Sequence, residues 1–260
     1  MAKPAWKKFP YPDKAFVFAG AALKKHWSRL HRGDREPYPD DAGLQEAWRL
    51  YHQGEFHKAC EAGLAAGIDG YNVANKATMI YANYLETDDQ RKLTLFQEIA
   101  ARCDELQRAQ PKNANAYYLQ AYALGRYSQG ISVIKALTQG LGGKIKAALE
   151  MALKLDPKHA DAYSALGAYH AEVVDKVGAL VGKLTYGASK DVAVKHFESA
   201  LKLAPDSAIA CIEYANALVM LFGKSRMDEA VKLYEKAAAA TPVDAMERLD
   251  VELAKSELAD

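Results

Sequence analysis

The stretch that decides the fold is Ala193-Val-Lys-His-Phe-Glu-Ser-Ala-Leu-Lys-Leu-Ala-Pro205, which returns as Ala230-Val-Lys-Leu-Tyr-Glu-Lys-Ala-Ala-Ala-Ala-Thr-Pro242. Both copies place alanine, an aromatic residue, alanine and proline at the same spacings. Small alanines let a neighbouring helix approach closely, the ring fills the space between helices, and the proline ends the helix. A third copy ends in Ala152-Leu-Lys-Leu-Asp-Pro157. The sequence therefore predicts an array of repeated helical units.

An alanine-rich helix start follows Pro111, Pro157 and Pro205, as in Pro157-Lys-His-Ala-Asp-Ala162. The block Ala162-Tyr-Ser-Ala-Leu-Gly-Ala168 then resembles the first helix of a tetratricopeptide (TPR) repeat. The distance from Pro205 to Pro242 is 37 residues, close to the ~34 of a TPR unit. The resemblance implies an all-α, TPR-like α-solenoid of stacked antiparallel helix pairs, and we expect one elongated body.

Two units are longer, because 46 residues separate Pro111 from Pro157 and 48 separate Pro157 from Pro205. The extra segments resemble each other in Ala136-Leu-Thr-Gln-Gly140 and Lys183-Leu-Thr-Tyr-Gly187. Apolar residues keep helical spacing through both insertions. We therefore expect additional amphipathic turns that lengthen the first helix of each of these two units.

Three regions are predicted along the chain. They are a basic N-terminal arm at 1–40 with an amphipathic helix at about 13–31, an array of about five helix pairs at 41–242, and a capping helix at 243–260. Residues 1–33 have a net charge of +7 and the remainder −6. The arm is therefore expected either to fold back onto the acidic array or to meet another acidic surface.

The basic side chains of the arm lie away from the apolar stripe of its predicted helix. This arrangement would allow weak contact with an acidic membrane surface through Lys24, Lys25, Arg29 and Arg32. Nucleic acid is not expected as a partner, because the rest of the chain is acidic.

A narrower resemblance covers residues 113–240. It rests on Gly130-Ile-Ser132, the long segments between paired helices, Ala147-Ala-Leu-Glu-Met-Ala-Leu-Lys-Leu-Asp-Pro157, Leu166-Gly167 and Ala193-Val-Lys-His-Phe-Glu-Ser-Ala200. These features are similar to the regulator of microtubule dynamics family. The resemblance implies a solenoid without catalysis and with a protein-binding role. Microtubule and organelle-contact roles are not carried over, because no position matches a motif responsible for them.

In a TPR solenoid the first helices of successive units line a concave groove. Their sides opposite the packing alanines carry a mixture of amide, hydroxyl, aromatic and charged groups, which suits an extended peptide or a partner helix. The predicted partner-binding residues are Asn75, Thr78, Asn115, Tyr118, Tyr122, Arg126, Asp161, Ser164, Glu172, Ile212, Asn216 and Met220. The alternative for a single residue, such as Tyr118 or Tyr122, is packing against the neighbouring unit.

The sequence predicts no enzyme, no cofactor and no metal site. Gly223-Lys-Ser225 is similar to the end of a phosphate-binding loop, but Leu218 stands where the first glycine is required. His52, His57 and Cys60 lack a fourth zinc ligand at the usual spacing. The odd number of cysteines, three, indicates no disulfide framework and favours a reducing compartment, so a cytoplasmic location is predicted.

We therefore expect a cytoplasmic, non-catalytic adaptor or scaffold that binds a partner peptide or helix in its groove. One alternative is an exported or membrane-surface TPR component that holds a small solute or peptide under the long insertions, since lysines precede the apolar run 15–23. Pro10, Pro12 and Asp13, immediately before that run, favour a retained helix over a signal peptide. A further alternative is an accessory subunit of an enzyme complex.

Overall fold

The computed structural model describes residues 5–259, so the first four residues of the predicted basic arm and Asp260 lie outside it. All regular elements in the described part are helical. Antiparallel pairs follow one another along it: α2 (Ala42–Gln53) with α3 (Phe56–Ala65), α4 (Tyr71–Ile80) with α5 (Asp89–Ala109), α6 (Ala114–Gln129) with α8 (Leu141–Leu155), α9 (Ala160–Val177) with α11 (Lys190–Leu203), and α12 (Ala208–Phe222) with α13 (Met227–Ala238). The predicted all-α solenoid of helix pairs is confirmed.

The repeated residues pack as their spacing predicts. Ala193, Phe197 and Ala200 of α11 are fully buried. The Phe197 ring lies so close to Gly167 of α9 that a Cβ at residue 167 would stand 2.8 Å from it. The same ring stacks on Tyr214 of α12, with centroids 5.1 Å apart. One aromatic side chain therefore packs against α9 and α12 as well as belonging to α11, and so holds three helices together.

The two insertions form separate short helices, α7 (Val133–Thr138) and α10 (Ala179–Tyr186). The prediction that they lengthen the first helices is wrong. α6 ends at Gln129, and the Ser132 side chain caps the new helix α7. α9 ends before Gly178, whose φ of 81° is incompatible with continuing the helix. Each insertion is therefore turned away from the helix that precedes it.

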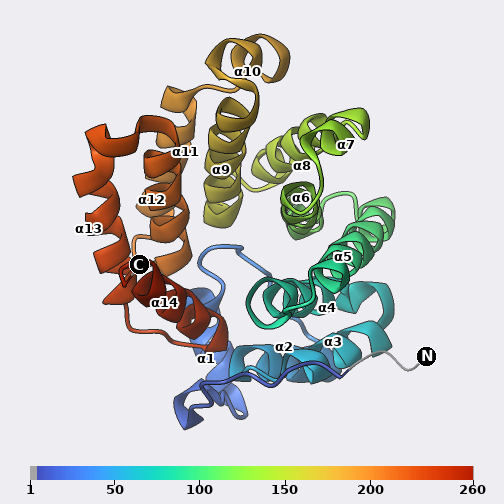
Figure 1. Cartoon of the computed structure of the whole chain (residues 1–260). Coiled ribbons are helices and arrows are strands. Elements are labelled where there is room, and N and C mark those ends of the chain that lie inside the picture. The colour runs from blue at the N-terminus through green and yellow to red at the C-terminus, as the bar shows by residue number, and fades with distance from the viewer. Residues whose placement is uncertain (1–4, 260) are drawn as a thin grey trace.

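The array curls until its two ends meet (Figure 1). The last helix, α14 (Ala245–Glu257), packs against α2, and the buried His52 Nδ1 of α2 lies 2.7 Å from Asp244 Oδ2 at the start of α14. Arg29 of α1 (Ala21–Leu30) forms a bidentate pair with Glu247 of α14. The expectation of an elongated body is wrong, because these contacts between distant segments close the solenoid into a ring.

The predicted helix at 13–31 is also corrected. The structure has a short 3₁₀ turn, η1 (Lys14–Phe16), and then α1, separated by Gly20 with φ 55°. Ahead of this turn the chain runs along the outside of α2 and α3 (Figure 1). There Trp6 stacks on Tyr81 of the π-helical turn η3 (Tyr81–Leu85), with centroids 4.1 Å apart. Aromatic contacts therefore hold the arm to the array.

Among residues 5–259, one helical stretch, Ala208–Ala238, is long and apolar enough to cross a membrane by length and composition. Half of its most apolar window is buried. The stretch turns at η4 (Gly223–Arg226), so that α12 and α13 pack against each other. In this structure it therefore forms a helix pair of the array. A further 3₁₀ turn, η2 (Gly67–Gly70), joins α3 to α4.

Candidate functional site

The connection between α1 and α2, residues 31–41, crosses the inside of the ring (Figure 1). We call it the strap. The backbone N–H of Asp161, at the start of α9, donates to the carbonyl of Gly33 at 3.1 Å. A Cβ at Gly33 would stand 2.2 Å from the Asp161 carboxylate, so a larger residue here would force that side chain to shift. The strap therefore covers part of the concave face that an open solenoid would leave free.

A chain of side-chain hydrogen bonds ties the strap to three first helices, α4, α6 and α9. The Glu36 carboxylate accepts from Asn72 Nδ2 at 2.9 Å and from Asn115 Nδ2 at 2.5 Å. Asn115 Oδ1 accepts from His159 Nε2 at 2.9 Å, and His159 Nδ1 accepts from the backbone of Ala162 to cap α9. Burial lowers the pKa of His159 to about 4. The neutral ring therefore supplies one donor and one acceptor.

A buried ion pair lies at the centre of the strap, between Asp34 and Lys76 of α4. Burial alone would raise the pKa of Asp34, but Lys76 and His31 together hold it well below its usual range. Burial lowers the pKa of His31 to about 4, although its Nδ1 lies 2.9 Å from Asp34. Burial, with the nearby charge of Asp34, raises the pKa of Glu36 to about 7. The strap thus combines a fixed anion with a carboxyl group that titrates near neutrality.

We expect wild-type stability, relative to that of Glu36→Gln, to fall by about 1–3 kcal/mol between pH 5 and pH 8. The pKa of Glu36 is raised in the folded state, so its contribution is fully present below the unfolded pKa and is lost as the pH rises through about 7. Urea unfolding of both proteins at several pH values measures this difference. Glu198→Gln, at an exposed site on α11, is the control and should show no such trend. A stability difference between wild type and Glu36→Gln that does not change with pH would contradict the raised pKa of Glu36.

Beyond the strap the ring encloses a cavity of about 370 Å³. One wall is apolar and is built by the two lengthened units. It includes Leu137 of α7, Ile145 and Leu149 of α8, and Tyr169 and Val173 of α9. The insertions therefore close one end of the cavity, while the strap and α14 line the other.

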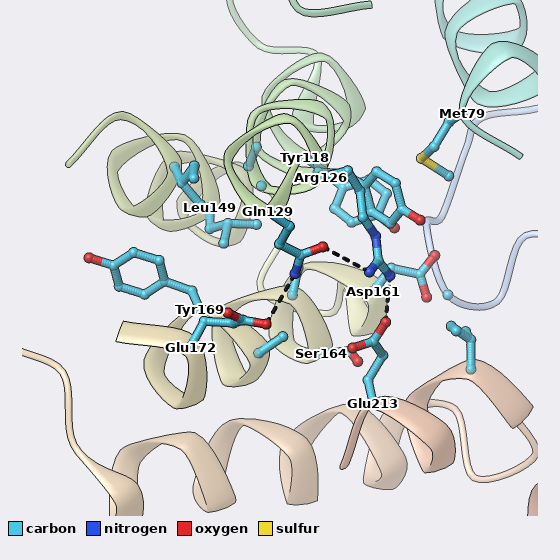
Figure 2. A pocket seen from close by; sticks show the side chains of 18 of the residues that line it. Met79, Tyr118, Arg126, Gln129, Leu149, Asp161, Ser164, Tyr169, Glu172 and Glu213 are labelled. Carbon is cyan, nitrogen blue, oxygen red and sulfur yellow. Dashed lines mark hydrogen bonds and ion pairs between the residues drawn. The ribbon is translucent and has the colours of Figure 1, made fainter. Parts of the chain in front are cut away.

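The neighbouring wall is polar and joins three first helices (Figure 2). Arg126 of α6 donates to Glu213 of α12 at 2.6 Å and to Gln129 at 3.2 Å. Gln129 in turn donates to Glu172 of α9 at 3.1 Å. The Arg126 guanidinium also lies 5.2 Å from the centre of the Tyr122 ring. These contacts hold amide, carboxylate and guanidinium groups in fixed positions beside the apolar wall.

Half of the predicted binding residues line this cavity. All of them come from α6 and α9: Tyr118, Tyr122, Arg126, Asp161, Ser164 and Glu172. The distinction between the packing side and the open side was therefore correct for the two helices with the clearest repeat pattern. Burial raises the pKa of Asp161 to about 6 and also raises that of Glu172. Whether these residues bind a partner stays a prediction.

The other predicted residues do not line the cavity. Asn75 and Thr78 of α4 are buried against α5, where both contact Arg102. Asn115 binds the strap. The structure places all three α12 residues in contacts between helices. Ile212 is buried among the side chains of α13 and α14, and Asn216 accepts a hydrogen bond from Tyr234 of α13. Met220 packs against an apolar cluster with residues from α9, α11, α12 and α13. Their predicted place on an open groove is wrong, because these sides of α4 and α12 pack against other helices and Asn115 bonds to the strap.

Several cavity residues were missed by the sequence analysis. Glu213 lies next to the predicted Ile212, so the predicted cavity-facing side of α12 was wrong by one residue. Lys76 and Met79 of α4 line the cavity, whereas the predicted Asn75 and Thr78 point away from it. Asp250 comes from the capping helix and accepts from Tyr84, and burial raises its pKa well above the usual range. The repeat pattern carries no signal for a capping helix that turns inward.

The basic residues of α1 and of the start of the strap divide into two groups. Arg29 and Arg32 both pair with Asp206, and Arg29 also pairs with Glu247. Acidic residues of the array therefore pair with both arginines, and their contact with a membrane stays a prediction. Lys24 and Lys25 are exposed. The arm was expected either to fold back onto the acidic array or to meet another acidic surface. The structure shows that Arg29 and Arg32 fold back onto the array.

The comparisons with known proteins agree with this architecture. Residues 44–259 match the family described as regulator of microtubule dynamics protein 1-3. The chain belongs to this family. The match extends well beyond residues 113–240, on which the resemblance in the sequence rests. No curated protein matches the sequence.

A solved structure of a thermophilic TPR protein from Thermus thermophilus is similar to the chain, with a TM-score of 0.58. The similarity covers 82% of this chain and 97% of the other at 18% sequence identity, so it shows the fold alone. Fold and family together indicate a helical repeat protein. Among residues 5–259, no group of three or more histidine, cysteine, aspartate or glutamate residues could hold a metal ion.

Proposed function

We propose that this protein is a non-catalytic adaptor that takes a short segment of a protein partner into the cavity of its ring. The observation that supports this proposal is the pairing of an apolar wall at Leu149 and Tyr169 with a polar wall at Arg126 and Glu172. An apolar side chain of the partner would pack on the first wall. Its backbone would bond to the fixed amide, carboxylate and guanidinium groups of the second.

The size of the cavity limits the form of the partner. A helix with its side chains is about 10–12 Å wide, whereas the concave face of this ring is already crossed by the strap and bordered by α14 (Figure 1). The partner segment is therefore short and enters end-on or through one anchoring side chain. A long helix lying in the groove, as the repeat pattern alone suggests, would have to displace residues 31–41.

We expect Gly125→Trp to reduce partner capture at least about tenfold, the effect of losing ~1.4 kcal/mol of binding free energy. Gly125 lines the cavity in α6, and a Cβ at this position meets no atom within 4 Å, so the indole grows into open space. Tagged wild type and variant are compared by affinity capture from native lysate with quantitative mass spectrometry.

The matched control is Gly143→Trp. Gly143 is also a helical glycine with open space around its Cβ, but it is exposed on α8 and does not line the cavity. This variant should recover partners as the wild type does. Equal capture by Gly125→Trp would show that partners bind elsewhere on the protein.

A second candidate function is the holding of a small molecule with an apolar tail and a polar end. The volume of about 370 Å³ favours it, since ligand sites in proteins are typically about 300–1,000 Å³. Native mass spectrometry of the purified chain should then show a bound small molecule that Gly125→Trp lacks and Gly143→Trp retains. The absence of such an adduct in the wild type would leave the partner segment as the occupant.

A further inference from the structure

The two insertion helices carry an unusual concentration of exposed apolar side chains. Six of the thirteen exposed large apolar residues in the described part of the chain lie on α7 and α10: Val133, Ile134, Leu137, Leu180, Val181 and Leu184. Ile134, Leu180 and Leu184 are 75%, 72% and 77% exposed. No residue of α7 is buried, and Gly182 alone is buried in α10. Such a concentration of exposed apolar side chains is typical of a surface that contacts a partner molecule or a membrane.

The fold brings these two helices to one edge of the ring. α7 follows α6 and α10 follows α9, and α6 and α9 are the first helices of adjacent units. First helices of adjacent units run in the same direction, so their C-terminal ends lie at the same edge. Lys146 of α8 donates to the carbonyl of Tyr186 at 3.0 Å, which joins the second half of one unit to α10 of the next. We call this surface, formed by α7 and α10, the insertion edge.

The charge of the insertion edge has a single sign. Residues 130–146 and 178–190 contain lysines but no aspartate or glutamate. Lys135, Lys144 and Lys183 are exposed. The acidic residues next along the chain are Glu150, whose carboxylate lies 3.7 Å from Lys146, Asp175, which pairs with Lys176, and Asp191. Exposed leucine and isoleucine beside lysine, without carboxylates, is the pattern of a helix that lies in the interface of an anionic bilayer.

We propose that the insertion edge docks on a bilayer that contains anionic phospholipid. Ile134, Leu180 and Leu184 enter the boundary between headgroups and acyl chains, and the lysines contact lipid phosphates. The apolar side chains are carried by two separate short helices. A fluid surface accommodates both helices at once, whereas a folded protein would need a matching pair of hollows. Val133 and Leu137 also line the cavity, whereas Ile134, Leu180 and Leu184 do not, so this proposal does not depend on the proposed function.

The test is co-sedimentation of the full chain with vesicles of phosphatidylcholine alone and of phosphatidylcholine mixed with phosphatidylserine. We expect at least about tenfold stronger binding to the mixed vesicles, and a decrease with added salt. Replacing one exposed lysine, as in Lys135→Ala, should weaken binding about fivefold. Ile134→Glu combined with Leu184→Glu should abolish it, because two carboxylates would have to enter the bilayer.

The matched control is Leu64→Glu combined with Val231→Glu. These residues are 41% and 38% exposed, on α3 and α13, away from the insertion edge. This variant should bind mixed vesicles as the wild type does. Thermal unfolding of both double variants checks that binding is lost without loss of fold. The proposal is overturned if wild type does not bind mixed vesicles at low salt, or if Ile134→Glu/Leu184→Glu binds them equally. It is also overturned if that variant loses a captured protein while vesicle binding persists.

Discussion

Lys76→Met is expected to lower the free energy of unfolding by about 3–5 kcal/mol, the largest effect of any single substitution in the strap network. Lys76 and Asp34 are both buried, and the lysine holds the pKa of Asp34 well below its usual range. Without Lys76, the Asp34 carboxylate must stay charged without its strongest partner or take up a proton. Urea unfolding at neutral pH measures the loss.

Two further variants separate this cause from the loss of packing. Asp34→Asn combined with Lys76→Met should recover part of the stability, because the amide oxygen can still accept from the backbone of Glu36 and leaves no unpaired charge. Lys112→Met, at an exposed position before α6, should change stability by less than about 0.5 kcal/mol. A double variant as unstable as Lys76→Met would show that the ion pair is not the source of the effect.

Phe197→Ala is expected to lower the free energy of unfolding by about 3–5 kcal/mol, as full truncation of a buried aromatic ring does. The ring is fully buried, stacks on Tyr214, and fills the space that Gly167 leaves open. Its removal leaves a void between α9, α11 and α12 that these helices can fill only by moving together. Thermal and urea unfolding, followed by far-UV circular dichroism, give the loss.

Tyr234 tests whether the loss of stability depends on the position of the ring in the repeat or on its packing. It occupies the place of Phe197 in the next copy, but its ring is half-buried and its hydroxyl donates to Asn216. Tyr234→Ala should therefore cost clearly less than Phe197→Ala. Equal losses would mean that the repeat position alone sets the contribution, whatever the surroundings of the ring.

The candidate site was predictable where the repeat pattern is sharp. In α6 and α9 the alanines fix which side packs, so Tyr118, Arg126 and Glu172 could be placed on the open side. The same reasoning failed for α4, whose residues Asn72–Ile80 are all buried between α3, α5 and the strap. It failed again for Ile212, because α14 covers that side of α12. A pattern of small and apolar residues does not distinguish a helix that is buried on one side from a helix that is buried on two.

The helix pairs, their order and the place of both insertions follow from the amino-acid sequence alone. These features depend on alanine, aromatic and proline spacings within some forty residues, and on the packing of each helix against its neighbours along the chain. Three other features emerge only in the folded molecule: the array closes, residues 31–41 cross its concave face, and a cavity remains. Closure depends on pairs such as Arg29 with Glu247 and His52 with Asp244, which lie 218 and 192 residues apart. Such pairs produce no periodic pattern in the sequence, because each is one contact between side chains that forms only when the chain folds into a ring.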